Sequence, residues 1–383
     1  MHHIASSLIA LAFALSGTAI ARCPADVTTE SFLAPGPLAV GVRTLTLVDA
    51  SRPTPAHAGV AALPARTLVT RVWYPADGPG GQAPVDDAPL AAGGPFPLVL
   101  NSHGFSELNV GCAYIAEALA RRGFVVVAPN FPSTNLTAPG GPWLPDVVNQ
   151  PGDVRFVLDE LIRLSDTAGS WLAGGVDERR IGAQGLSLGG LTTLLVAYNP
   201  TLRDPRIRAA FTMAPYSCPL TRKLLRPAPS LMLVNGDHDL ITPLDQNAGR
   251  TFARGRMPRR LITLAGATHT AFTGLVTGTG TANYDAAIGC QALENVGQAT
   301  MDETLAAFGP AVKGTDLQGC ELPCSDPAPA GPSMSADRQH ELTQAAAVAF
   351  FQERLQKSHA AHCFLDRTFA AENADVTFQR RPR

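Results

Sequence analysis

The feature that most constrains the fold of this chain is a series of short, mainly apolar runs that begins at residue 96 and alternates with helical patterns. These runs read "FPLVLNSHG", "FVVVAPN", "RIGAQ", "IRAAFTM", "SLMLVNG" and "RLITLAG". Continuous rather than alternating hydrophobicity is typical of strands buried on both faces, and such strands belong to parallel sheets covered by helices. We therefore predict an α/β fold with a mostly parallel central sheet and helices on both faces.

The segments between these runs carry helix signals. "AYIAEALARRG" and "LGGLTTLLVAY" have helix composition, and the apolar residues of "PGDVRFVLDELIRL" follow one face of an amphipathic helix. A final helix is predicted over "SADRQHELTQAAAVAFFQERLQ", with Ser335 as its N-cap. Ahead of residue 96, "VRTLTLVD" and "RTLVTRVWYPA" alternate better, and they predict an antiparallel edge of the sheet.

The first 21 residues have the layout of a secretory signal peptide. They contain no Asp, Glu, Lys or Arg, carry an apolar run from Leu8 to Leu15, and end in the small-x-small sequence Ala19-Ile20-Ala21. The apolar run is too short for a permanent membrane anchor. We expect residues 1–21 to be removed, residues 22–383 to form one catalytic domain, and the protein to be secreted or periplasmic.

Residues 270–334 interrupt the regular pattern with a stretch rich in Gly, Thr, Ala and Pro. A structureless loop of this length is uncommon in a compact domain, so we expect a lid-like or loop-rich insertion there. The chain has seven cysteines, four of them between residues 290 and 363. In an oxidising compartment this predicts up to three disulfides and one odd thiol, with bridges that hold the insertion.

Charge and metal-ligand patterns exclude two classes of partner. The net charge of −2 provides no basic field for nucleic acid. Cys320-x-x-x-Cys324 lacks the second well-spaced pair that a zinc site needs, so no metal is predicted.

Three polar residues follow predicted strands in an informative order. Ser187 is the centre of Gly-x-Ser-x-Gly, between a strand and a helix, and its flanking glycines allow the strained turn of an exposed nucleophile. Asp239 follows the strand "SLMLVNG", and His269 follows the next one. Ser, Asp, His is the chain order of the α/β-hydrolase fold. Ser187 is therefore the predicted nucleophile, His269 its base, and Asp239 the carboxylate that orients the histidine.

Asp237 is the alternative carboxylate in "GDHD". Asp239 is preferred because Asp237 lies too close to the strand end to reach His269. Each motif alone has a plain interpretation, as a tight turn or a surface loop, and it is their joint order that favours catalysis.

Two backbone N–H groups are predicted to form the oxyanion hole that the mechanism requires. One belongs to Leu188, directly after the serine, and the other to Phe105 in "LNSHGFS". His103 is expected to shape this loop rather than act as a base. Candidates for the walls of the substrate pocket are His103, Trp143, Leu186 and Phe272.

The motifs "TRVWYPA", "LVLNSHGFS", "VDERRIGAQGLSLGG" and "GATHTAF" resemble those of secreted bacterial serine hydrolases of the dienelactone-hydrolase-like group. That group is similar to platelet-activating factor acetylhydrolase, chlorophyllases and cutinase-like polyester hydrolases. The resemblance implies hydrolysis of carboxylic esters through an acyl-enzyme, with no cofactor. Dienelactone hydrolase itself has cysteine where this chain has Ser187, so its lactone substrate is not carried over.

The predicted function is therefore that of an exported serine esterase acting on neutral short-to-medium acyl or aromatic esters, because no cluster of Lys or Arg accompanies the motifs. Its partner would be a small-molecule or polymeric ester. The alternatives are a polyester hydrolase, an exported peptidase or amidase, and an inactive hydrolase fold that serves as a binding module.

Overall fold

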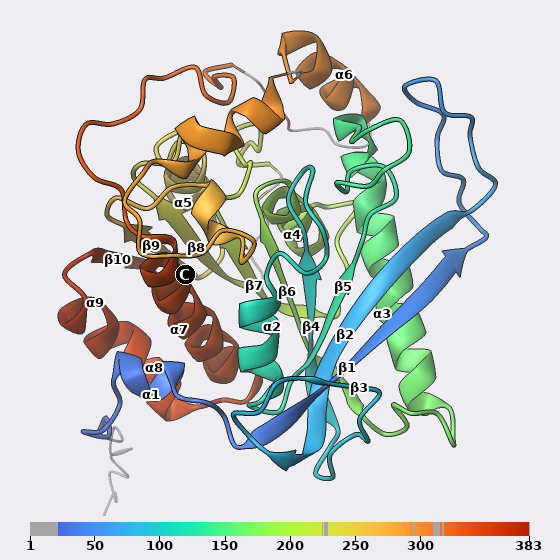
Figure 1. The fold of residues 1–383 in the computed structure, drawn as a ribbon, viewed down its shortest axis with the longest axis vertical. Helices are drawn as coiled ribbons and strands as arrows, with labels where there is room; N and C mark the ends of the chain where they lie inside the picture. Colours follow the sequence, from blue (N-terminus) through green and yellow to red (C-terminus); the bar gives the residue numbers. More distant parts are fainter. Residues whose placement is uncertain are drawn as a thin grey trace, which may run out of the picture.

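The structure is a computed structural model, and it describes residues 22–223, 225, 229–294, 296–308, 315 and 318–382. The predicted signal peptide lies outside these residues. A ten-stranded sheet with the order β10-β9-β8-β7-β6-β4-β5-β2-β1-β3 forms the centre of the molecule (Figure 1). In the described part of the chain, no helix is both long enough and apolar enough to cross a membrane.

The middle of the sheet is parallel, as predicted. All residues of three of its strands, β4, β5 and β8, are buried, which is the reason for their continuous hydrophobicity. The parallel strands are β4 (Phe96–Ser102), β5 (Val125–Pro129), β6 (Val176–Leu186), β7 (Ile207–Met213), β8 (Ser230–Gly236) and β9 (Arg259–Leu264).

Both edges of the sheet are antiparallel or short. The predicted N-terminal edge is confirmed, because β1 (Leu38–Asp49) pairs antiparallel with β2 (Arg66–Pro79), and β2 pairs antiparallel with β5. The two-residue β3 (Val85–Asp86) extends this edge. At the opposite edge, β10 (Val376–Arg381) pairs antiparallel with β9. This strand was not predicted, since most of its residues are exposed and it has no apolar run.

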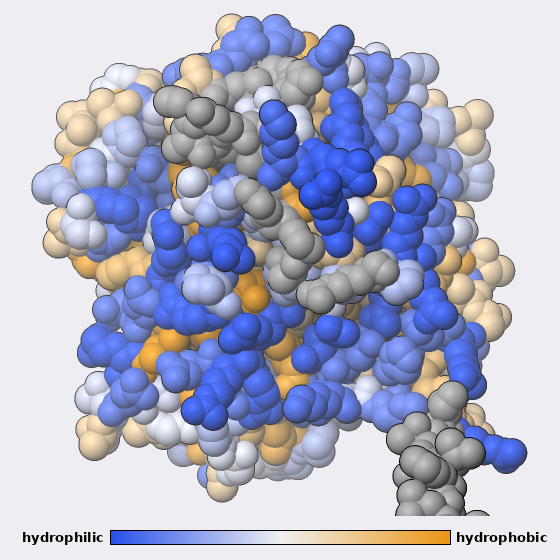
Figure 2. All heavy atoms as spheres, turned by 180° about the vertical axis from the view of Figure 1, so that it is seen from behind, coloured by the Kyte–Doolittle hydropathy of each residue, from blue (hydrophilic) through white to orange (hydrophobic). Residues whose placement is uncertain are grey.

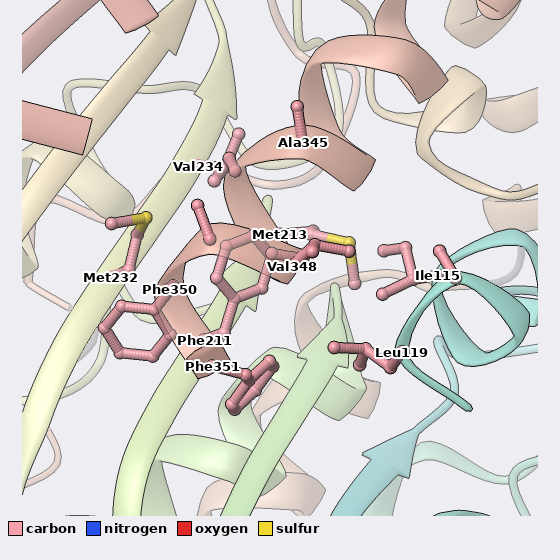
Figure 3. Close-up of a cluster of buried hydrophobic side chains, with 14 of the residues drawn as sticks. Ile115, Leu119, Phe211, Met213, Met232, Val234, Ala345, Val348, Phe350 and Phe351 are labelled. Carbon is pink, nitrogen blue, oxygen red and sulfur yellow. The ribbon is translucent and has the colours of Figure 1, made fainter. Parts of the chain in front are cut away.

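One face of the sheet is covered by α2 (Ala113–Ala120) and α7 (Ala336–Leu355). Figure 3 shows how α2 and α7 pack their apolar side chains on those of β7 and β8, with Phe350 and Phe351 beside Phe211. Ser335 caps α7, as predicted, by accepting a hydrogen bond from Arg338 N. Short elements complete this side: α1 (Thr29–Leu33), α8 (His359–Cys363), η6 (Phe364–Thr368) and α9 (Phe369–Glu372).

The other face carries α3 (Gln150–Asp166), α4 (Leu188–Tyr198) and α5 (Ala248–Arg254), together with the 3₁₀ helix η1 (Leu144–Asn149). The apolar face predicted for α3 is buried against the sheet. Figure 2, which views the molecule from behind, shows a mainly hydrophilic surface with scattered apolar residues. Helices on both faces confirm the predicted α/β class.

The segment from residue 270 to 334 lies at the end of the sheet toward which β4–β7 point, at the top of Figure 1. Its described elements are η2 (Thr270–Phe272), η3 (Asp285–Gly289), η4 (Gln291–Leu293) and α6 (Gln298–Phe308). The predicted count of disulfides is confirmed: the bridges are Cys23–Cys363, Cys218–Cys320 and Cys290–Cys324, and Cys112 is a buried free thiol. Cys218–Cys320 therefore joins this predicted insertion to the rest of the domain, and Cys290–Cys324 closes a loop within it.

Candidate active site

Ser187 occupies a sharp turn between β6 and α4, with φ 55° and ψ −116°. This left-handed backbone is strained for any residue with a Cβ and costs about 1–3 kcal/mol. The turn persists because its surroundings fix it: Ser187 N donates to Met213 O at 2.9 Å. The two motif glycines permit close backbone contact, since a Cβ at Gly189 would lie 2.0 Å from Ser102 O and one at Gly185 2.2 Å from Gly189 O.

His269 and Asp239 form a buried hydrogen-bonded pair, with Nδ1 of the histidine 3.0 Å from Oδ2 of the carboxylate. The other carboxylate oxygen, Oδ1, accepts from Ile241 N at 2.9 Å and Thr242 N at 2.7 Å. Thr242 Oγ1 lies 3.0 Å from Oδ2 and 3.0 Å from His269 Nδ1. With Nδ1–H donated to the carboxylate, Nε2 is left as the acceptor nitrogen.

Asp237 takes a different position from Asp239. Its side chain is exposed, and Oδ1 accepts a hydrogen bond from Gly266 N at 2.6 Å, which closes the turn after β9. The histidine therefore pairs with the second carboxylate of "GDHD".

The electrostatics of this pair favour a cationic imidazole. Burial lowers the pKa of His269, but the charge and hydrogen bond of Asp239, with smaller contributions from Asp285 and Glu107, outweigh burial, and the net pKa is raised. A histidine in this setting accepts a proton readily, and Asp239 stabilises the imidazolium that forms.

The two residues predicted to supply the oxyanion donors both line a pocket with Ser187. Leu188 is the first residue of α4, so its N–H belongs to the first turn, whose donors have no partner inside the helix and carry the positive end of its dipole. Phe105 follows β4, and Phe105, Ser187 and Leu188 line one pocket. A Cβ on the neighbouring Gly104 would lie 3.5 Å from Ser187 Cβ, so the loop approaches the serine closely.

Two buried side chains hold the loop that carries Phe105. His103 Nε2 accepts from Phe131 N at 3.0 Å, so its Nδ1–H donates to Gly104 O at 2.7 Å. Burial lowers the pKa of His103 to about 4, and the ring stays neutral at pH 7. Glu107 Oε2 accepts from Gly104 N at 2.6 Å. His103 thus contacts the loop backbone, and Glu107 is a contributor that sequence reasoning missed.

A mainly apolar pocket opens beside Ser187. Its described lining contains no charged side chain, and part of its wall comes from the insertion. The lining residues are Phe105, Leu144, Ser187, Leu188, Tyr216, Ile241, Thr242, Leu293, Val296, Met301 and Pro323. A mainly apolar lining with a few polar groups is typical of a small-molecule site.

The residues predicted for the pocket walls lie elsewhere among the described residues. Leu186 and Phe272 are buried in the core on the α2 and α7 face. Trp143 stacks on His57 with ring centroids 5.0 Å apart, one residue before the lining residue Leu144. Thr242 and Tyr216 line the pocket instead, and only Thr242, three residues after Asp239, had a local sequence signal.

A serine on a strand-to-helix turn, a histidine–carboxylate pair after the next strands and a mainly parallel sheet define the class of this protein: it is an α/β hydrolase. A solved structure of a ferulic acid esterase from Streptomyces cinnamoneus has the same fold, with a TM-score of 0.57 and 23% sequence identity over 89% of this chain and 96% of that chain. Residues 50–284 match the family model described as PETase: PET hydrolase-like. The chain belongs to this PET hydrolase-like family and is a carboxylic ester hydrolase. A comparison with curated proteins gives no match.

Proposed function

We propose that this protein is an exported serine esterase that cleaves neutral carboxylic esters through an acyl-enzyme, with Ser187, His269 and Asp239 as its triad. The observation that carries the proposal is the 3.0 Å contact between His269 Nδ1 and Asp239 Oδ2, found together with a serine in a strained strand-to-helix turn. Thr242 connects the His269–Asp239 pair to the pocket of Ser187, because it contacts His269 Nδ1 and lines that pocket. Export is supported by the three disulfides, which are typical of oxidising compartments.

In the acylation step, Ser187 Oγ attacks the ester carbonyl carbon while His269 Nε2 takes the hydroxyl proton. The negative charge that develops on the carbonyl oxygen is stabilised by the N–H groups of Phe105 and Leu188. The tetrahedral intermediate then collapses, and the leaving alcohol receives the proton from His269. Water repeats the sequence on the acyl-serine, which releases the carboxylic acid and restores the serine.

The pocket supports an ester with an apolar acyl or aromatic part. Its described lining is apolar apart from Ser187, Thr242 and Tyr216. The related ferulic acid esterase is named for an aromatic acid, and the family is named for a polyester with aromatic rings. Polyester hydrolysis is the second candidate, favoured by the family description. Small esters are the first candidate, because residues of the insertion, such as Leu293 and Met301, form part of the wall of the pocket at Ser187.

The test combines active-site labelling with turnover. A fluorophosphonate probe should label wild-type protein but not Ser187→Ala, and Ser187→Ala should lower kcat by about 10⁶-fold. Asp239→Asn should lower kcat by about 10⁴-fold, because the histidine loses the partner that sets its tautomer. Asp237→Asn is the matched control and should stay within threefold of wild type.

Unlabelled, inactive wild-type protein would favour a binding module, and faster cleavage of matched amides than of esters would favour a peptidase. An equal loss in Asp237→Asn and none in Asp239→Asn would contradict the triad. A series of p-nitrophenyl esters of increasing acyl length, with an aromatic polyester film beside it, decides between small esters and polymers.

A further inference from the structure

Asp285, in the insertion, contacts the backbone of both loops that carry the histidine and its carboxylate. Its side chain is fully buried at the start of η3. Oδ2 accepts from Leu240 N at 3.0 Å, directly after Asp239, and from His269 N at 2.9 Å. Oδ1 accepts from Thr270 N at 2.7 Å. One carboxylate thus satisfies three backbone donors that neither loop satisfies by itself.

The position of Asp285 is itself fixed by its neighbours. Asn283 Oδ1 accepts from Asp285 N at 3.0 Å, and Asn283 Nδ2 donates to His238 O at 3.3 Å. Gly289, at the end of η3, lets the segment approach closely, since a Cβ there would lie 2.1 Å from Thr270 Oγ1.

The disulfide Cys290–Cys324 closes this arrangement. Cys290 N donates to Asp285 O at 2.8 Å, and Cys324 N donates to Leu240 O at 2.7 Å. The bridge therefore joins the end of the Asp285 element to Cys324, whose backbone N–H is hydrogen-bonded to the loop that bears Asp239. These contacts make the insertion part of the support for the site.

We propose that Asp285 is a positioning residue for the esterase reaction, which holds the Asp239 loop and His269 in register and adds a second negative charge beside the imidazole. The inference rests on the proposed function. Asp285 lies one residue beyond the segment that matches the family, which ends at residue 284. It is not among the residues that line the pocket, and its hydrogen bonds go to the backbone of the two loops, through which it acts.

The charges around the imidazole support this role. The groups that act on His269 are Asp239 after β8, Asp285 in η3 and Glu107 after β4, all carboxyls. The net pKa of Asp285 is raised, because burial and the nearby charge of Asp239 outweigh His269 and the hydrogen bonds to Thr270. Both oxygens of Asp285 accept backbone N–H groups, which favours the ionised carboxylate. Removal of the Asp285 charge therefore lowers the pKa of His269.

The test is Asp285→Asn in the full-length mature protein, with Asp237→Asn as the control, because Asp237 also accepts a backbone N–H near these loops but is exposed. We expect kcat to fall about 10²-fold with KM within threefold, since a small displacement of the catalytic groups affects the transition state more than binding. The acid limb of the pH–rate profile should move to lower pH. An NMR titration of the His269 imidazole should show the same lowered pKa.

A kcat within twofold of wild type would overturn the inference, and so would a loss of kcat without any change in the pKa of His269, which indicates a purely structural role. The two proposals can fail separately. If the wild-type protein is inactive and unlabelled, the proposed function is contradicted. If the pKa of His269 still falls in Asp285→Asn, the positioning role of Asp285 is supported even then. Should Asp285→Asn fail to fold, Asn283→Ala is the second variant. It leaves the carboxylate in place but frees the turn, and a kcat unchanged from wild type would overturn the inference.

Discussion

The serine and the histidine of this site are held by two different kinds of structure. The turn at Ser187 is built into the sheet, where β6, α4 and the end of β4 crowd around Gly185 and Gly189. The loop at His269 lies at the edge of the insertion, where a buried carboxylate and a disulfide hold the backbone. Packing fixes the first, and polar contacts between distant segments fix the second.

This difference predicts how well each of the two loops tolerates substitution. A strained turn enclosed by backbone atoms tolerates almost no added volume, because protein interiors are close-packed. A loop held by a few hydrogen bonds can move by small amounts without disturbing the core. Substitutions at the serine turn should therefore damage stability and activity together, and those at the insertion should damage activity more than stability.

Among the substitutions that test how the two loops are held, Gly189→Ala should have the largest effect. Its Cβ would lie 2.0 Å from Ser102 O and 2.6 Å from His103 O, so the loop with the oxyanion donor must move. We expect kcat/KM to fall by about 10²-fold or more and the free energy of unfolding to fall by about 1–3 kcal/mol. Turnover and a denaturant titration measure both.

Gly297→Ala is the control for this substitution, because nothing lies within 4 Å of a Cβ at that position in the insertion. It should leave both quantities near wild type. Normal turnover in Gly189→Ala would contradict the claim that close packing of backbone atoms fixes the turn at Ser187.

The next largest effect should distinguish the disulfide Cys290–Cys324 from Cys23–Cys363. Cys290→Ser with Cys324→Ser should lower kcat about tenfold, because Asp285 loses its anchor, while loop-closure entropy for 34 residues predicts a stability loss of up to about 4 kcal/mol. Cys23→Ser with Cys363→Ser is the matched control, with a separation of 340 residues. It should lose more stability, up to about 6 kcal/mol, and keep its kcat. Thermal unfolding and kcat on a soluble ester test this, and equal losses of kcat in both double variants would contradict it.

The difference between local packing at the serine turn and long-range contacts at the histidine loop also determines what could be predicted from the sequence. The parallel strands and the serine turn are readable because their signals are local: apolar runs, glycines at fixed spacing and the order of three residues. Strand β10 is not readable, since an exposed edge strand needs no apolar run. Asp285 lies 45 residues from Leu240 and 16 from His269 and follows no motif, so only the folded chain shows its partners.

The pocket was the least predictable part of the site. Leu186 directly precedes the proposed nucleophile Ser187, and Phe272 follows the proposed base His269 by three residues, yet both side chains are buried in the core on the α2 and α7 face. Successive residues of a strand point to opposite faces, so proximity in sequence to Ser187 does not imply a place in its pocket. The walls come instead from segments such as η4 and α6, whose position depends on the disulfides.

The smallest predicted effect is on pH dependence. His269 must be neutral to accept a proton, so the rate rises with pH through its pKa. Because the net pKa is raised, we expect the acid limb of kcat/KM to lie above about 6.5. The stability contribution of the same group has the opposite trend: it is fully present below the unfolded-state pKa and is lost as pH rises through the folded-state pKa.

Three carboxyls face His269, and burial raises the pKa of two of them, Glu107 and Asp285, so a rate profile alone does not identify the titrating group. His103 is not a candidate, since its pKa of about 4 keeps it neutral throughout this range. Rates measured from pH 5 to 9 beside an NMR titration of His269 assign the limb. We expect the midpoint of the rate profile and that of the NMR titration to coincide, and both to be lower in Asp285→Asn. A residue of the insertion would then set the pKa of the proposed base without altering the serine turn. An acid limb of kcat/KM with its midpoint at or below about 6.5 would contradict the raised pKa of His269.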